Sequence, residues 1–359
     1  RRQRQMCIRD SFVGFQVGWF VVCANFAGRA ANFHVLVAYL AALFPVFGGD
    51  VARPVTVIAL IALATFVSVI GTRRAIGAMW VGTALKLAPI LLLAGYGLIA
   101  NGLPGAVDLP DFSEGESVIL LIAYAFSGVG VAMISAGETK APTTTIYRSI
   151  FLSLGFVTAL YVLIQLAYSV TVIEQDNPDV PLAAMGEALL GQTGVTMISL
   201  AAIFSIATNQ LAGFVVIPRI LFGMGRRGLL PPVFAHVSPR FQTPSVAITF
   251  FGAVVALLAA SGTFAGLATM LVAAEQIFIA ACILALIILW RRGEGRVAQT
   301  MGPHWLAIIG VAIVLTIWLT AQVPLNAALS TGLLAGVGTL LSFLAWANAR
   351  EGEATRFVG

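Results

Sequence analysis

The sequence predicts an all-α polytopic membrane protein, and composition, hydropathy and the spacing of apolar runs carry that prediction. Hydrophobic residues make up 59% of the 359 residues and charged residues 10%, against about 45–50% and about 25% in soluble domains. The mean hydropathy of +0.98 is spread along the chain in apolar runs of about 20 residues, enough to cross a bilayer. Soluble, fibrous and disordered classes are therefore excluded.

Ten apolar stretches, separated by loops rich in Gly, Pro and charge, predict ten transmembrane helices. They span approximately residues 12–44, 54–70, 75–100, 117–136, 149–173, 193–223, 245–260, 263–290, 305–321 and 325–346. The first and sixth exceed the length that a bilayer of ~30 Å requires at ~1.5 Å per residue, so we expect strong tilts. Pro89 and Pro218 predict kinks in the third and sixth helices. The two long helices are five positions apart in the series, which suggests an inverted five-helix repeat.

Basic residues sort to one side of the predicted membrane. Only Arg53 falls in the opposite loops. The basic side, cytoplasmic by the positive-inside rule, carries Arg73, Arg74, Lys140, Arg148, Arg219, Arg226, Arg227, Arg240, Arg291, Arg292, Arg296, Arg350 and Arg356. The carboxyl terminus is then expected in the cytoplasm. Basic residues in cytoplasmic loops are usual in polytopic membrane proteins, so the net charge of +5 indicates no nucleic-acid partner.

Residues 1–11, RRQRQMCIRDS, resemble a translated transposon-end sequencing adapter rather than native sequence. The alternative is a basic arm that contacts anionic lipid. We exclude the segment from fold reasoning, as for fusion scars, and divide the rest into a transporter core, residues 12–292, and two peripheral helices with a cytoplasmic tail, residues 293–359.

The predicted helix 117–136 contains a glycine-rich interruption. Gly128 and Gly130 follow Phe126 and Ser127 near its middle, and each glycine weakens a helix by ~1 kcal/mol relative to alanine. Unwound backbone at that depth is tolerated beside protein or a watery cavity, where its dipoles can bind a zwitterion. Close helix packing through small residues is the alternative.

Three stretches resemble amino acid permeases of the amino acid, polyamine and organocation (APC) superfamily. AYAFSGVGVAMISAGETKAP, residues 123–142, resembles that family's sixth helix. RILFGMGRRGLLPPVFAHVSPRFQTP, residues 219–244, and GTRRAIGAMWVGTALKLAPILLL, residues 71–93, resemble the loop after its eighth helix and its fifth helix with the preceding loop. The resemblance implies a twelve-helix fold, five plus five plus two, in which this chain supplies helices three to twelve and the first two helices are missing.

By this resemblance the interrupted helix holds substrate. The implied substrate-binding residues are Tyr124, Phe126, Ser127, Gly128, Val129 and Gly130. Phe126 or Tyr124 would cover the bound side chain as an aromatic lid. Some family members that transport cationic substrates, or that are strictly coupled to acid, carry a carboxylate where Gly130 stands. The absence of a carboxylate here favours neutral amino acids as substrates.

Lys86 lies well inside the third predicted helix, where a charge needs a partner or a role. In the family a lysine at this place occupies what is a sodium site in sodium-coupled relatives. The resemblance therefore implies proton coupling through Lys86, with Ser205, Thr208 and Asn209 as neighbours. A lysine that reaches to the membrane interface is the alternative.

Arg29 and Glu275 lie at similar predicted depth on the first and eighth helices. A charge there costs at least ~2.5 kcal/mol, which favours pairing. We expect the two to form a buried ion pair, structural or part of an outer gate. His34, also within the first helix, is expected to be a hydrogen-bonded packing residue rather than a proton relay.

The sequence thus predicts a secondary amino acid transporter of the cytoplasmic membrane, working by alternating access as a proton-coupled symporter or an exchanger. An amine or polyamine exchanger is the second possibility. An enzyme is not expected, because Cys23 has no basic neighbour to activate it, His34 has no metal partner and Glu275 has no second acid, and a channel would need polar rings. Amino acid, proton and lipid bilayer are the expected partners, without a cofactor or metal. We expect a bacterial inner membrane location.

Overall fold

The computed structural model describes residues 2–71, 75–105, 112–128, 142–172, 180–292 and 304–356, and it confirms the all-α class. Within these residues there are helices and loops and no strand. Short 3-10 helices, η1 (Pro45–Gly48) and η3 (Pro232–Ala235), lie in two of the loops. The α-helices are α1 (Arg2–Leu43), α2 (Ala52–Ile70), α3 (Ala75–Asn101), α4 (Phe112–Ala125), α6 (Pro142–Thr171), α7 (Pro181–Leu190), α8 (Gln192–Val216), α9 (Pro218–Arg226), α10 (Ser245–Ser261), α11 (Phe264–Arg292), α13 (His304–Ala321) and α14 (Leu325–Arg356).

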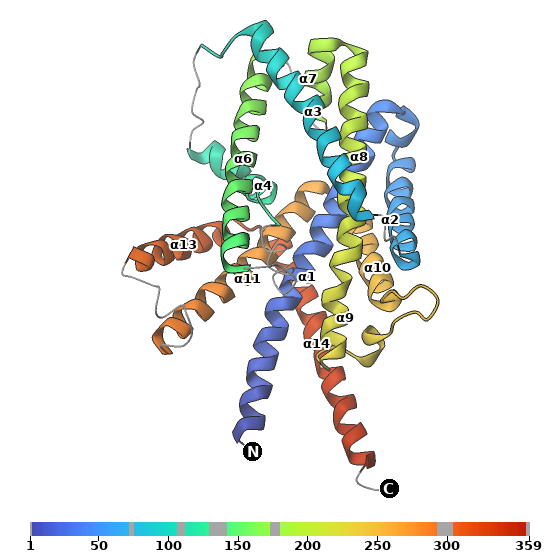
Figure 1. The fold of residues 1–359 in the computed structure, drawn as a ribbon, viewed down its shortest axis with the longest axis vertical. Coiled ribbons are helices and arrows are strands. Elements are labelled where there is room, and N and C mark those ends of the chain that lie inside the picture. The colour runs from blue at the N-terminus through green and yellow to red at the C-terminus, as the bar shows by residue number, and fades with distance from the viewer. Residues whose placement is uncertain are drawn as a thin grey trace.

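Nine of the ten predicted spans coincide with a described helix or with part of one; of the tenth, 117–136, the described residues are helical as far as Ala125. Among the described residues six helical segments are long and apolar enough to cross a membrane: 14–43, 52–70, 148–171, 192–226, 264–292 and 325–347. Shorter apolar helices cover 87–101, 245–261 and 305–321. The chain is therefore an integral membrane protein. In Figure 1 α1 begins and α14 ends at the lower end of the molecule.

Two elements differ from the prediction. Helix α7 lies in the stretch that had been taken as the loop between two spans. The predicted helix 193–223 is divided at Ile217, where Pro218 begins α9. Ile217 still donates its N–H to Gly213 (2.9 Å), but Pro218 has no N–H to continue the series. Pro89 lies within α3, which continues through it.

Helix α1 runs through the middle of the bundle, in contact with α8, α10, α11 and α14 (Figure 1). Its residues 2–11, the segment that resembles an adapter, continue the helix backbone. Trp19 is fully buried, and its indole N–H donates to the carbonyl of Leu334 in α14 (2.8 Å). One of the two helices that had been placed outside the core thus packs directly on α1.

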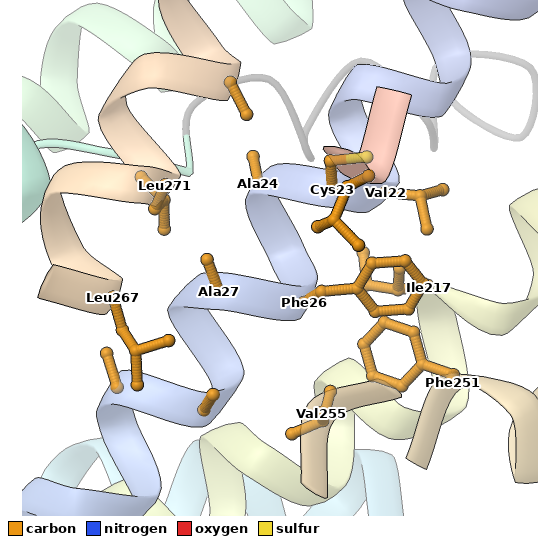
Figure 2. Close-up of a cluster of buried hydrophobic side chains, with 14 of the residues drawn as sticks. Val22, Cys23, Ala24, Phe26, Ala27, Ile217, Phe251, Val255, Leu267 and Leu271 are labelled. Carbon is orange, nitrogen blue, oxygen red and sulfur yellow. The ribbon is translucent and has the colours of Figure 1, made fainter. Parts of the chain in front are cut away.

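The two sides of α1 differ in side-chain size (Figure 2). Ala24 and Ala27 face α11, from which Leu267 and Leu271 project, whereas Phe26 points the other way toward Phe251 of α10. The Phe26 and Phe251 ring centroids lie 5.1 Å apart. Because lipid tails are as apolar as these side chains, close packing holds membrane helices together rather than burial from water. Around α1, small residues on one side and aromatic rings on the other provide this close packing.

Candidate substrate-binding cavity

Helix α4 ends inside the bundle. Its last helical residue is Ala125, and residues 126–128 form a turn in which Gly128 has φ +94°. Only glycine adopts such a backbone without strain. The freed carbonyl of Ala125 accepts a hydrogen bond from the Tyr161 hydroxyl of α6 (3.1 Å). Within the described residues the helix therefore ends at the turn that contains Gly128, and Gly130 lies outside them.

A cavity of about 770 Å³ lies at this helix end. Its walls come from α1, α4, α6, α8 and α11, helices far apart in the sequence. The volume falls within the ~300–1,000 Å³ of typical small-molecule sites. Six of the residues singled out in the sequence line it: Arg29, Tyr124, Ser127, Gly128, Asn209 and Glu275. Its lining combines one cation and one carboxylate with hydroxyl, amide and apolar groups.

On one wall, Arg29 reaches from α1 across to α8. Its Nη1 donates to the backbone carbonyl (2.9 Å) and side-chain oxygen (2.6 Å) of Asn209 and to Oε1 of Gln210 (3.2 Å). The buried Gln210 amide donates in return to the backbone carbonyl of Arg29 (2.8 Å). The guanidinium lies against Gly213, where a methyl group would collide with it. Polar contacts to α8 therefore hold Arg29 in place, and Gly213 leaves the space that its guanidinium occupies.

Glu275 of α11, which also lines the cavity, contacts the end of α4. Its Oε1 accepts the backbone N–H of Gly128 (3.2 Å). Arg29 and Glu275 line one cavity, but in the described part of the chain they do not form the predicted ion pair. Arg29 bonds to Asn209 instead, and Glu275 bonds to Gly128. The neighbouring amides of Asn209 and Gln210 satisfy Arg29, and a backbone amide satisfies Glu275.

The two predicted lid aromatics lie differently. The Tyr124 hydroxyl donates to Oδ1 of Asn32 (3.1 Å), and its ring packs edge-on against Phe264 beside the cavity. Phe126 packs edge-on against Tyr161, with centroids 5.3 Å apart, and lines a separate pocket of about 320 Å³ between α4 and α6. Of the two, Tyr124 lines the larger cavity, and the lid role stays a prediction.

The other predicted residues are less directly connected to the cavity. Thr208 donates to the carbonyl of Phe204 in its own helix (2.7 Å), and neither it nor Ser205 lines the cavity. Val129, Gly130 and the Lys86 side chain lie outside the part of the chain that the structure describes, so their predicted roles remain predictions. His34 contacts the carbonyl of Ala259 through Nε2 (3.0 Å), which fits a packing histidine.

Sequence reasoning missed several polar residues around the cavity. Asn25 and Asn32 line it from α1, and Tyr161 lines it from α6. Asn25, Arg29 and Asn32 follow one another at i, i+4 and i+7, a spacing that puts them on one face of a helix. This polar stripe in an otherwise apolar span was visible in the sequence. Gln210 and Tyr161 carried no comparable pattern, because only packing brings them to Arg29 and Ala125.

Fold and cavity together define a helical membrane protein with a charged chamber inside its bundle at the end of a broken helix. The chain belongs to the amino acid permease family: a family model described as amino acid permease matches residues 5–342. The family is one of permeases and not of enzymes, as predicted.

Individual relatives have low sequence identity to the chain. The chain is similar to the cadaverine/lysine antiporter of Escherichia coli K12, 25% identical over 62% of this chain and 52% of the antiporter. It is 26% identical to the vacuolar cationic amino acid transporter 4 of Arabidopsis thaliana, over 78% of this chain and 51% of that protein. The serine/threonine exchanger SteT of Bacillus subtilis is 25% identical, over 80% of this chain and 67% of SteT. The chain thus spans about half the length of the first two.

Proposed function

We propose that the protein is a secondary transporter that moves amino acids across the membrane by alternating access, as a proton-coupled symporter or an exchanger. The observation that carries the proposal is the cavity of about 770 Å³ at the broken end of α4. Backbone dipoles at the end of an interrupted helix can bind charged groups that would otherwise lose their water. Membership of the amino acid permease family supports an amino acid as the ligand.

The end of α4 is also the part of the cavity wall that we expect to move during transport. Short turns that end a helix inside a bundle can reorient at lower cost than a continuous helix, because few backbone hydrogen bonds hold them. The turn after α4 is held by Tyr161 on one side and by Glu275 on the other. Rocking of α4 against α11 would open or close the cavity at these two contacts.

Proton coupling through Lys86, with Ser205, Thr208 and Asn209 nearby, is part of the proposal and rests on the resemblance alone. Asn209 adds a structural reason for interest, since it bonds Arg29 in the cavity wall. A change at the Lys86 site that moved α8 would reach the cavity through this contact. We further propose uptake into a bacterial cell across the inner membrane, with the carboxyl terminus in the cytoplasm.

An amine or polyamine exchanger is the second possibility, and the name of the cadaverine/lysine antiporter favours it. The cavity lining speaks against it. A diamine carries two cations, and the described lining offers one carboxylate and also the Arg29 cation, which would repel a dication in a site of low dielectric.

The test is uptake of a panel of radiolabelled amino acids and diamines by the full-length protein in liposomes, with and without an inward proton gradient or sodium. We expect saturable, stereoselective uptake of an amino acid subset, accelerated by the gradient or by a trans-side amino acid, and independent of sodium. Uptake of diamines but not of amino acids would establish the alternative. No uptake of either by verifiably folded protein would refute the transport proposal.

A Lys86→Ala variant tests the coupling separately. If Lys86 couples transport to protons, the variant should lose the acceleration by the gradient while it still exchanges substrate across the membrane. A variant that retained the wild-type response to the gradient would exclude Lys86 from coupling and leave the transport function intact.

A further inference from the structure

A basic segment, residues 219–243, joins α9 to α10, and we name it the basic cap. Its arginines are all exposed: Arg219, Arg226, Arg227 and Arg240. The apolar segment before it ends at Arg226 and α10 begins at Ser245, so the cap lies where two membrane helices reach the surface. No Asp or Glu stands between Glu187 and Glu275 in the sequence. Within the described residues none of the four arginines forms an ion pair, so their charge has no partner in this part of the protein.

Packing and hydrogen bonds hold the basic cap in a defined conformation. Phe234 of η3 is buried and packs edge-on against Phe250 of α10, with ring centroids 5.1 Å apart. Gly225 of α9 leaves room for η3, because a Cβ at that position would meet Phe234 at 2.9 Å. The Thr243 hydroxyl donates to the carbonyl of Val69 in α2 (2.6 Å). A folded segment rather than a free loop therefore presents the arginines.

The exposed surface of the basic cap is amphipathic. Arg219, Phe222 and Arg226 follow one another at i, i+3 and i+7, which places them on one face of α9. The Arg226 guanidinium lies over the Phe222 ring, 5.9 Å from its centroid. Val233 and Val237 are 54% and 38% exposed. Positive charge beside exposed apolar side chains is typical of segments that lie in the interface of a membrane.

Anionic phospholipid matches this surface in charge and in position. A guanidinium binds phosphate oxygens through two parallel N–H groups, and clusters of basic residues next to a membrane helix attract anionic headgroups. The helices on both sides already hold the cap at the level of the headgroups. Lipid binding therefore avoids most of the entropy cost that a soluble acidic partner would incur on association, and it also accounts for the exposed valines.

We propose that the basic cap is a binding site for anionic phospholipid. The four arginines contact the headgroup phosphates, and Val233 and Val237 enter the boundary between headgroups and acyl chains. None of these residues lines the cavity at the end of α4. The inference therefore concerns a second site and does not depend on the transport proposal.

Hydrogen exchange locates the binding in the full-length protein. The protein would be reconstituted in nanodiscs of phosphatidylcholine alone and in nanodiscs with equal parts of phosphatidylcholine and phosphatidylglycerol. We expect the amides of residues 227–243 to exchange more slowly in the anionic discs. The amides of residues 46–51, in the loop that contains η1 and lies on the opposite side in the predicted topology, should exchange equally in both.

Variants assign the binding to charge at the cap. Native mass spectrometry in detergent would count the short-chain lipids that remain bound, dioctanoyl phosphatidylglycerol or dioctanoyl phosphatidylcholine. An arginine near an anionic surface corresponds to about fivefold in affinity, so Arg226→Gln with Arg227→Gln should weaken phosphatidylglycerol binding by more than about tenfold. Arg226→Lys with Arg227→Lys keeps the charge and should retain most of it. Arg291→Gln with Arg292→Gln, exposed at the end of α11, is the matched control and should have a smaller effect.

Apolar contact separates a lipid from a free phosphate. Val233→Ser with Val237→Ser should weaken phosphatidylglycerol binding and leave the binding of glycerol 3-phosphate unchanged. In the wild type, phosphatidylglycerol should bind more tightly than glycerol 3-phosphate. Unfolding temperatures equal to that of the wild type in phosphatidylcholine discs verify that the variants are folded.

Three results would overturn the proposal. Equal exchange of the cap in both kinds of nanodisc would show that anionic lipid does not contact it. Equal losses from the glutamine pairs on the cap and on α11 would show a general response to positive charge and no site. Glycerol 3-phosphate that bound as tightly as phosphatidylglycerol would assign the arginines to free phosphate. Uptake through the cavity is measured separately and stands or fails independently of these results.

Discussion

The two walls of the cavity are built in different ways. Arg29 is held against α8 by contacts to Asn209 and Gln210, with Gln210 bonding back to the Arg29 carbonyl and Gly213 providing the space. Glu275 has a single described contact, to the backbone of a turn whose helix has already ended. The α1–α8 wall is therefore the more rigid of the two, and the α4–α11 wall, held by fewer contacts, is expected to move at lower cost.

The burial of the helices follows the same division. In α1 61% of the apolar window is buried inside the molecule, whereas in α6, which supports the end of α4, the share is 6%. A helix that is buried over most of its length cannot shift without displacing close-packed side chains. A helix with few neighbouring side chains can shift more easily. We therefore expect α6 and α4, rather than α1, to move when a ligand binds.

The largest expected effect is on the fixed wall, from Gly213→Val. The new side chain would occupy the space of the Arg29 guanidinium and displace it from Asn209 and Gln210. Overpacking of this kind costs about 1–3 kcal/mol, and we expect the upper end because hydrogen bonds are lost too. Thermal unfolding in detergent measures it. Gly223→Val on α9, where an added Cβ meets no atom within 4 Å, is the control; equal losses in both variants would contradict the fixed-wall interpretation.

A smaller loss is expected for Gln210→Leu. The substitution removes both hydrogen bonds between Gln210 and Arg29 but leaves the bonds from Arg29 to Asn209. At about 0.6 kcal/mol per interhelical bond, and up to ~1.7, the unfolding free energy should fall by about 1–3 kcal/mol. The exposed Gln192→Leu, at the start of the same helix, should change it little. An unaltered unfolding temperature in Gln210→Leu would mean that these bonds do not stabilise the wall.

On the α4 side, Gly128→Ala tests the turn itself. There is open space around the position, so the cost comes from the backbone, which at φ +94° disfavours any side chain by roughly 1–2 kcal/mol. Because the turn is not part of the packed frame, we expect loss of substrate affinity with only a modest shift in unfolding temperature. In Gly155→Ala, on α6 with equally open surroundings, helix propensity predicts no loss. If Gly128→Ala unfolded the protein as readily as Gly213→Val, the two walls would not differ as described.

The smallest expected effect is that of Tyr161→Phe. It removes the hydroxyl that bonds the Ala125 carbonyl and should cost about 0.6 kcal/mol. The sharper readout is hydrogen exchange, which should rise at the amides of residues 126–128 and stay unchanged in α8. Tyr168→Phe, on the same helix, provides the comparison. Equal exchange at the turn in wild type and variant would show that Tyr161 does not hold it.

The sequence gives a good account of the spans and of the broken helix. Ten apolar runs correspond to helices because a helix of about 20 apolar residues is the simplest way to satisfy backbone polar groups in lipid. Gly128 indicated the end of regular helix in α4 because glycine both weakens a helix and permits positive φ. Helix α7 was missed because it is short and lies in a segment outside the long apolar runs.

The sequence was less informative about which groups contact the buried charged side chains. It indicated that Arg29 and Glu275 need compensation, since a membrane-buried charge must find some. The nearest opposite charge was the natural expectation, yet neutral amides of Gln210 and Asn209 and a backbone N–H take that role. Phe126 and Tyr124 are two residues apart and equally suited to cover a ligand by type, but the turn after Ala125 directs only Tyr124 to the cavity.

By itself, then, the sequence determined what is local or averaged over a segment: the membrane class, the spans, the break in α4 and the presence of buried charges. Only the tertiary structure decided which helices enclose the cavity and which atoms face it. Those choices depend on packing between helices as distant as α1 and α11, and a contact between residues 29 and 209 leaves no periodic trace in the chain.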